Sequence, residues 1–200
     1  MIHPDLQIRQ SGRRSFECIA AKTRMMGAQL LTVCSGSCDP DDQWRHHPGN
    51  AGADAWGEML REFEHLIRIA DQHDIRIGVE PELGNVVSSA AKAAELISAM
   101  QSDRIRIVLD AANLFEIANA SEQRRIIEEA IDRLGPFIEV AHAKDRNPDG
   151  SFAAAGKGVI DFRHYLASLK AAGFAGDLIT HGLSAQEAPG VANFLKAALS

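Results

Sequence analysis

Four side chains that could bind a metal ion follow one another at roughly equal spacing in this sequence. Each ends a short apolar run: Glu80 in "IRIGVE", Asp110 in "IRIVLD", His142 in "FIEVAH" and His181 in "DLITH". Carboxylate oxygens and imidazole nitrogens are the donors expected for divalent ions such as Mn²⁺, Zn²⁺, Co²⁺ and Mg²⁺. Any one of these residues, taken alone, is more often a helix cap, a turn residue or a packed core histidine. The repetition over four successive runs is therefore what predicts a metal site.

The elements that carry these residues explain their spacing. Apolar, β-branched runs predict strands at 29–34, 75–80, 105–110, 137–142 and 177–181. Amphipathic patterns with caps and stops predict helices at 54–74, 86–100, 121–134, 161–172 and 185–199. Strict alternation of this kind predicts a parallel sheet covered by helices, with the carboxyl ends of the strands on one rim. We therefore expect a single α/β domain over residues 1–200, of the TIM-barrel type, with about five strand–helix units.

The amino-acid composition restricts which partners the protein can have and in which compartment it is found. Apolar residues make up 46% and charged residues 24%, and 21 basic against 27 acidic side chains give a formal charge of −6. An acidic surface repels phosphate backbones, so we expect no nucleic-acid partner. No apolar run approaches the roughly 18 residues that a membrane span needs, so we expect no membrane partner. Three cysteines (Cys18, Cys34 and Cys38) without a framework pattern favour reduced thiols and a cytoplasmic location.

Several longer stretches together resemble a known family. They are "SGSCDPDDQWRHHPGNAGADAW", "VEPELGNVV", "VLDAANLF", "VAHAKDRNPDGSFAAAGKGVIDF" and "LITHGL". They look like the sugar phosphate isomerase/epimerase family with a xylose isomerase-like barrel, and His-x-Lys-Asp followed by Gly-x-Gly-x-Ile-Asp is the most specific part. The resemblance implies that Glu80, Asp110 and His142 bind one divalent metal ion.

The sequence departs from the family pattern in two ways. The fourth ligand of the family is usually a Glu on the last strand, where this chain has Thr180 and His181, so His181 is the candidate fourth ligand or acid/base. The five predicted strands match the fourth to the eighth of the family, so the chain lacks three N-terminal units relative to the family. We therefore expect the strand at 29–34 to have an unpaired side or to pair with a second chain in a homo-oligomer.

These assignments predict a metal-dependent isomerase or epimerase that moves protons on an open-chain sugar or sugar phosphate. Glu80 is the candidate base and His181 the candidate acid. The candidate substrate-binding residues are Trp44, His47, Asn113, Lys144, Arg146 and Lys157. Lys144, Arg146 and Lys157 could equally be solvated charges in loops. Trp44 could equally be a packing residue. Two other classes stay open: a metal-dependent endonuclease-like barrel, which the acidic charge disfavours, and a non-catalytic remnant of the family.

Overall fold

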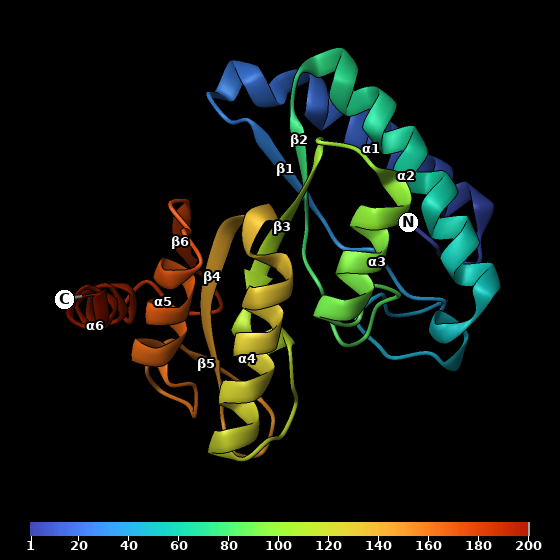
Figure 1. Cartoon of the computed structure of the whole chain (residues 1–200). Helices are drawn as coiled ribbons and strands as arrows, with labels where there is room; N and C mark the ends of the chain where they lie inside the picture. The colour runs from blue at the N-terminus through green and yellow to red at the C-terminus, as the bar shows by residue number, and fades with distance from the viewer. Residues whose placement is uncertain (200) are drawn as a thin grey trace. The chain divides into compact units, whose positions relative to one another are not determined.

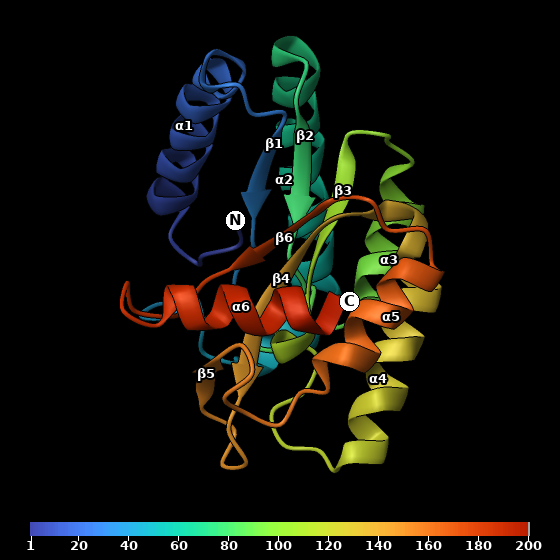
Figure 2. The same ribbon diagram turned by 90° about the vertical axis from the view of Figure 1, so that its left-hand side faces the viewer.

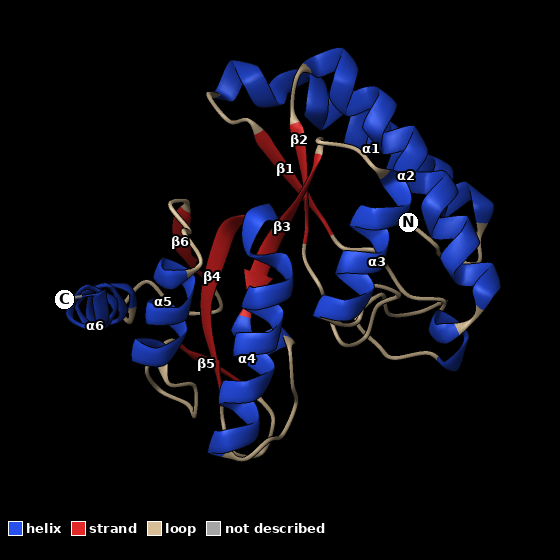
Figure 3. Cartoon of the chain, viewed as in Figure 1, coloured by secondary structure: helices blue, strands red, loops and turns tan. Residues whose placement is uncertain are grey.

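The computed structural model describes residues 1–199, in which strands and helices alternate along the chain (Figures 1 and 3). The chain divides into two compact units, a first unit of residues 1–107 and a second unit from Val108 onward. The division falls inside strand β3 (Ile105–Asp110), so the last three residues of this strand belong to the second unit. Each unit is described by itself below.

The first unit contains two parallel strand pairs. Its elements are α1 (Leu6–Thr23), β1 (Leu30–Val33), α2 (Ala53–His73), β2 (Arg76–Val79), α3 (Ala90–Met100) and the start of β3, with 3₁₀ turns at Arg24–Met26 and Pro48–Ala51. β1 pairs in parallel with β2, and β2 pairs in parallel with β3, with Ile77 opposite Ile105. Among residues 1–199, β1 has β2 as its one strand neighbour, which agrees with the expected edge. Helices α1 and α2 pack against each other next to these strands (Figure 2).

The second unit is built around the long strand β4. Its elements are α4 (Ala120–Leu134), β4 (Ile138–Arg146), β5 (Phe152–Ala154), α5 (Phe162–Ala171), β6 (Asp177–Thr180) and α6 (Ala188–Leu199), with 3₁₀ turns at Ala111–Asn113 and Gly135–Phe137. β6 pairs in parallel with the first part of β4, and β5 pairs antiparallel with its last three residues. Helix α5 contacts both α4 and α6. Both units therefore have the parallel strand pairs and covering helices of the α/β, TIM-barrel type of fold.

Burial explains the two patterns seen in the sequence. Ile107, Val108 and Leu109 are all fully buried, so β3 is covered on both faces and has no polar alternation. In α2 the buried side chains recur every three or four residues, as Met59, Phe63 and Leu66 do, because one stripe of the helix faces the strands.

The five predicted strands and five predicted helices are present, and the differences have physical causes. Helix α1 was not predicted because Phe16, Ala20 and Thr23 are its buried residues, too few for an apolar stripe. Ion pairs hold it instead: the Arg13 guanidinium donates to the buried Glu62 carboxylate at 2.7 Å. Helix α3 begins four residues later than predicted because the Ser89 side chain caps it.

The other difference is in β4, which does not end at His142 as predicted. The strand continues for four residues because the chain turns back and β5 pairs with residues 144–146. The buried carboxylate of Asp145 holds this hairpin and the turn after it, since it accepts the backbone N–H groups of Gly156, Gly158 and Ile160 at 2.9 to 3.0 Å. These three backbone amide groups are therefore satisfied inside the protein.

Every helix among residues 1–199 is either too short or too polar to span a lipid bilayer.

The N-cap of α5 gives a prediction about pH. The Asp161 carboxylate accepts from the backbone N–H of His164 at 3.1 Å and from the Arg124 guanidinium at 2.7 Å. The His164 amide lowers the pKa of Asp161, partial burial opposes this, and Arg124 lowers it further, so the net pKa lies below its usual range. A carboxyl whose pKa is lower in the folded state than in the unfolded state stabilises the fold at pH values above its unfolded pKa of about 3.9. This stabilisation disappears as the pH falls through the pKa of the folded state.

We therefore expect Asp161→Ala to lower the free energy of unfolding by about 1 kcal/mol at pH 7. The difference from wild type should shrink below about pH 4. Urea unfolding at several pH values measures this, and Asp132→Ala, at an exposed site on α4, is the matched control. An equal loss at pH 7 and at pH 3 would show that the charge of Asp161 is not what stabilises the helix.

Candidate metal centre

Asp110, the last residue of β3, is the centre of a polar cluster in the second unit. Its side chain is 1% exposed, and its Oδ1 atom accepts the backbone N–H of Ala112 at 2.9 Å, which caps the 3₁₀ turn after the strand. This bond orients the carboxylate. The other oxygen, Oδ2, lies 3.2 Å from Nε2 of His181 and 3.8 Å from Nδ1 of His142.

The two histidines reach Asp110 from neighbouring strands. His142 lies within β4 opposite Ile179, and His181 directly follows the last residue of β6. The two rings meet edge to face, with 4.5 Å between their centroids. His181 thus turns toward Asp110 and His142.

The donor set of these three residues fits a divalent ion. One ligand atom each of Asp110, His142 and His181 lies within 4.8 Å of the others. Zinc–nitrogen and zinc–oxygen bonds of roughly 2.0 to 2.2 Å need ligand atoms slightly closer to one another than this. One carboxylate and two imidazoles also match the mixed oxygen and nitrogen preference of first-row divalent ions.

Asp110 is held in its anionic form. Burial raises the pKa of this carboxyl, but the hydrogen bond from His181, the positive charge and hydrogen bond of Lys144, and the amide of Ala112 together outweigh it. The net pKa lies below the usual range, so the side chain is ionised at neutral pH.

Lys144 and Asn113, two of the candidate substrate-binding residues, border the cluster, and their contact with a substrate stays a prediction. The buried Lys144 ammonium lies 3.1 Å from Asp110 Oδ2 and donates to Asn113 Oδ1 at 2.9 Å. Phe152, which sequence reasoning missed, covers this ammonium with its ring centroid 3.9 Å from Nζ, and its side chain is 51% exposed. Only the β4–β5 pairing brings it there. The sequence feature that could have indicated this hairpin is the turn motif "NPDGS", which directly precedes Phe152.

The other two predicted cations occupy different places. Arg146 is buried, its guanidinium donates to the carbonyl oxygens of Ala112 and Gly150, and its Cζ lies 4.2 Å from the Phe152 ring. These contacts fix the hairpin and the turn after β3, a structural use that we had not predicted. Lys157 is exposed in the turn between β5 and α5.

The remaining predicted residues belong to the first unit. Glu80 directly follows β2 and is partly exposed, and its backbone N–H donates to the carbonyl of Val33 at 3.2 Å. It therefore stands at a strand end, as predicted, and its part in the metal site stays a prediction.

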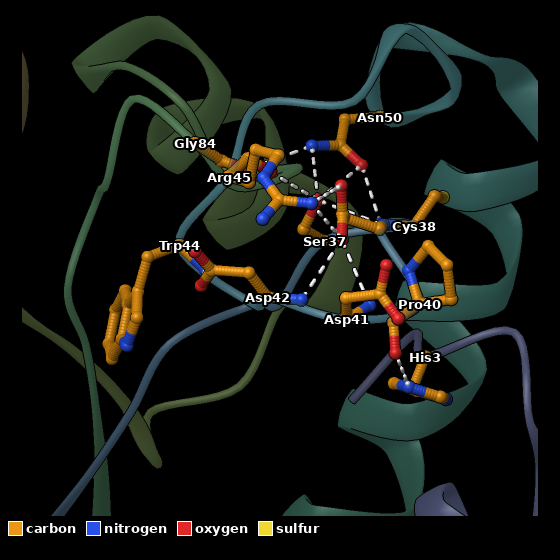
Figure 4. Close-up of polar contacts among 11 residues, drawn as sticks. His3, Ser37, Cys38, Pro40, Asp41, Asp42, Trp44, Arg45, Asn50 and Gly84 are labelled. Atoms are coloured by element: carbon orange, nitrogen blue, oxygen red, sulfur yellow. Dashed lines mark hydrogen bonds and ion pairs between the residues drawn. The ribbon is translucent and has the colours of Figure 1, made fainter.

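Trp44 and His47 lie in the loop after β1, which a network of buried polar contacts holds in place (Figure 4). Asn50 is the centre of this network: its side chain accepts the N–H of Cys38 and donates to the carbonyl of Gly84, both at 2.8 Å. The Trp44 ring is 54% exposed and points away from these contacts (Figure 4). His47 caps the 3₁₀ turn by accepting the N–H of Gly49 with Nδ1, so that its other ring nitrogen is the one left for a ligand.

Comparison with known proteins identifies the fold. Three solved structures superpose on nearly the whole chain. A xylose isomerase domain protein from Planctomyces limnophilus is 19% identical with a TM-score of 0.76, and the match covers 96% of this chain and 66% of that one. A D-tagatose 3-epimerase-like protein is also 19% identical with a TM-score of 0.76, covering 96% and 70%. The IOLI protein with a bound zinc atom is 18% identical with a TM-score of 0.73, covering 98% and 72%.

The chain thus spans about two thirds of the length of these structures. No match is found among curated proteins. A model of the xylose isomerase-like TIM barrel matches residues 1–196, which is almost the entire sequence. On this match, and with the parallel strands and covering helices described above, the chain belongs to the xylose isomerase-like TIM barrel family.

Proposed function

We propose that this protein is a metal-dependent isomerase or epimerase that acts on a sugar or sugar phosphate in its open-chain form. The observation that carries the proposal is the convergence of Asp110, His142 and His181 on one point in the second unit. Membership of a family whose solved relatives include a D-tagatose 3-epimerase-like protein supports the choice of substrate class.

Glu80 completes the metal site in this proposal. It ends a strand that runs parallel to the start of β3, just as Asp110 ends β3 itself, and parallel strands of a barrel bring their carboxyl ends to one rim. Two carboxylates and two imidazoles suit Mn²⁺, Zn²⁺, Co²⁺ or Mg²⁺, and the zinc bound to the IOLI protein is one precedent among the relatives. When bound, such an ion polarises a carbonyl and an adjacent hydroxyl of the sugar as a Lewis acid.

The protein side chains do the rest of the chemistry. The carboxylate of Glu80 takes the proton from the carbon that lies between the carbonyl and hydroxyl groups of the sugar. The imidazole of His181, when it is not a ligand of the ion, delivers a proton on the opposite side, because its Nε2 lies in the cluster. Lys144 and Asn113 bind a substrate oxygen from the β4 side, since both border Asp110.

Residues in the loop after β1 bind the sugar further from the reacting carbons. The exposed Trp44 ring offers a face for the C–H groups of the sugar, and His47 offers its remaining ring nitrogen. Lys157, exposed in its turn, attracts a phosphate group on the substrate. We propose the reducing cytoplasm as the location, because the three cysteines of the sequence form no framework pattern. A second copy of the chain is the proposed cover for the free side of β1.

The metal site is tested first by removing its central ligand. We expect Asp110→Asn to weaken Mn²⁺ or Zn²⁺ binding by more than about tenfold, because even outer-sphere changes have effects of that size. Calorimetric titration of the purified protein measures this, with Asp132→Asn on the surface of α4 as the control. Equal affinities for wild type and Asp110→Asn would place any bound ion elsewhere.

The role of His181 is tested by changes in opposite directions. His181→Ala should weaken metal binding, because a ligand is lost. His181→Glu should strengthen it, because a carboxylate adds a negative charge that a neutral imidazole lacks. If both variants titrate like wild type, His181 is structural and the fourth position belongs to another group.

The reaction itself is tested by proton exchange. In D₂O, wild type with Mn²⁺ should introduce deuterium at the carbon next to the carbonyl of a ketose, and NMR detects the loss of that proton signal. Glu80→Gln should lower the exchange rate by about 100-fold or more, since it removes the base. Glu64→Gln, at an exposed position on α2, should leave the rate unchanged. A protein that binds metal tightly and exchanges no proton with any sugar or sugar phosphate would support the non-catalytic alternative.

A further inference from the structure

Asp110 has a built-in positive partner in the second unit. Its Oδ2 atom lies 3.1 Å from the Lys144 ammonium, and both side chains are nearly inaccessible to solvent, at 0% exposure for Asp110 and 9% for Lys144. A buried carboxylate without a positive or donating partner is strongly destabilising, so this ammonium compensates the charge of Asp110 in the structure as it stands.

Lys144 is held at that position from several directions. It follows His142 by two residues on β4, so both side chains leave the strand on the same face. Asn113 Oδ1 accepts from Nζ at 2.9 Å, and the Phe152 ring covers Nζ at 3.9 Å. The hairpin that carries Phe152 is in turn fixed by Asp145, as described above. The ammonium therefore has a fixed position in the cluster and is not a mobile charge on the surface.

The position of this ammonium conflicts with a metal ion. Oδ2 is the oxygen of Asp110 that lies nearest the two histidines, and it is also the oxygen that Lys144 contacts. A divalent cation bound there would lie a few ångströms from a second positive charge in a buried site, where like charges repel strongly.

We propose that Lys144 is the internal counter-ion of this site, which neutralises Asp110 in the metal-free protein and gives up Oδ2 when a divalent ion binds. Asn113 and Phe152 retain the displaced ammonium beside the site. Lys144 thereby sets how tightly the metal is held, a role distinct from its predicted contact with substrate. The inference rests on the proposed function only in that a divalent ion binds at Asp110.

The test compares metal affinity with the stability of the metal-free protein. Lys144→Met removes the charge, and Lys144→Gln removes it while keeping a group that can hydrogen-bond. We expect both to bind Mn²⁺ and Zn²⁺ at least about tenfold more tightly than wild type, by calorimetric titration. The same variants, freed of metal, should melt roughly 5 °C or more below wild type, because Asp110 loses its partner.

Two control variants isolate the charge at this position. Lys144→Arg keeps it, so its metal affinity should stay close to wild type. Lys196→Met removes a lysine from an exposed position on α6 of the same unit, and should change neither quantity. The inference is supported only if Lys144→Met and Lys144→Gln bind metal more tightly and are also less stable than wild type without metal. General damage to the fold would instead weaken metal binding.

The possible results separate this inference from the proposed function. If the charge-removing variants bind metal with wild-type or weaker affinity, Lys144 is not a competing counter-ion, while metal binding by wild type still supports the proposed function. If neither wild type nor any variant binds Mn²⁺ or Zn²⁺, the metal centre and the inference fail together.

Discussion

The carboxylate of Asp110, buried at the end of a fully apolar strand, is the constraint on which the second unit depends. An ionised group in such a place must be surrounded by donors and positive charge. The amide of Ala112, His181 and Lys144 supply them, and each comes from a different segment of the chain. The same arrangement that stabilises the buried carboxylate also suits it to bind a metal ion, because the groups gathered around it include two imidazoles.

The hairpin after His142 is the second requirement of the site. β4 continues past the histidine, and β5 folds back onto it so that Phe152 lies over both Lys144 and Arg146. Asp145, between these two cations, points the other way and collects backbone amides from the following turn. Alternation along one strand thus separates a side chain that faces the cluster from one that stabilises the loop.

The loop after β1 follows a comparable principle in the first unit. Asn50 and Asn85 bond to backbone groups of the loop, and Gly84 allows the Trp44 carbonyl to approach more closely than any side chain would permit. The loop is therefore held by its backbone, which leaves the Trp44 ring exposed. A rigid loop with an exposed aromatic ring loses little conformational entropy when a ligand binds.

The sequence alone determined the alternation of strands and helices, because burial on both faces of a strand and on one stripe of a helix leaves a visible apolar pattern. It also located the strand ends that carry Glu80, Asp110 and His181, since a polar residue after an apolar run interrupts that pattern. Tertiary structure decided what no local pattern records. Helix α1 is held by ion pairs to α2, Arg146 and the glycine amides serve the hairpin, and Lys144 faces Asp110. The physical reason is that a polar side chain has no periodic signature: whether it binds a ligand, a neighbouring backbone or another charge depends on which distant segment the fold brings next to it.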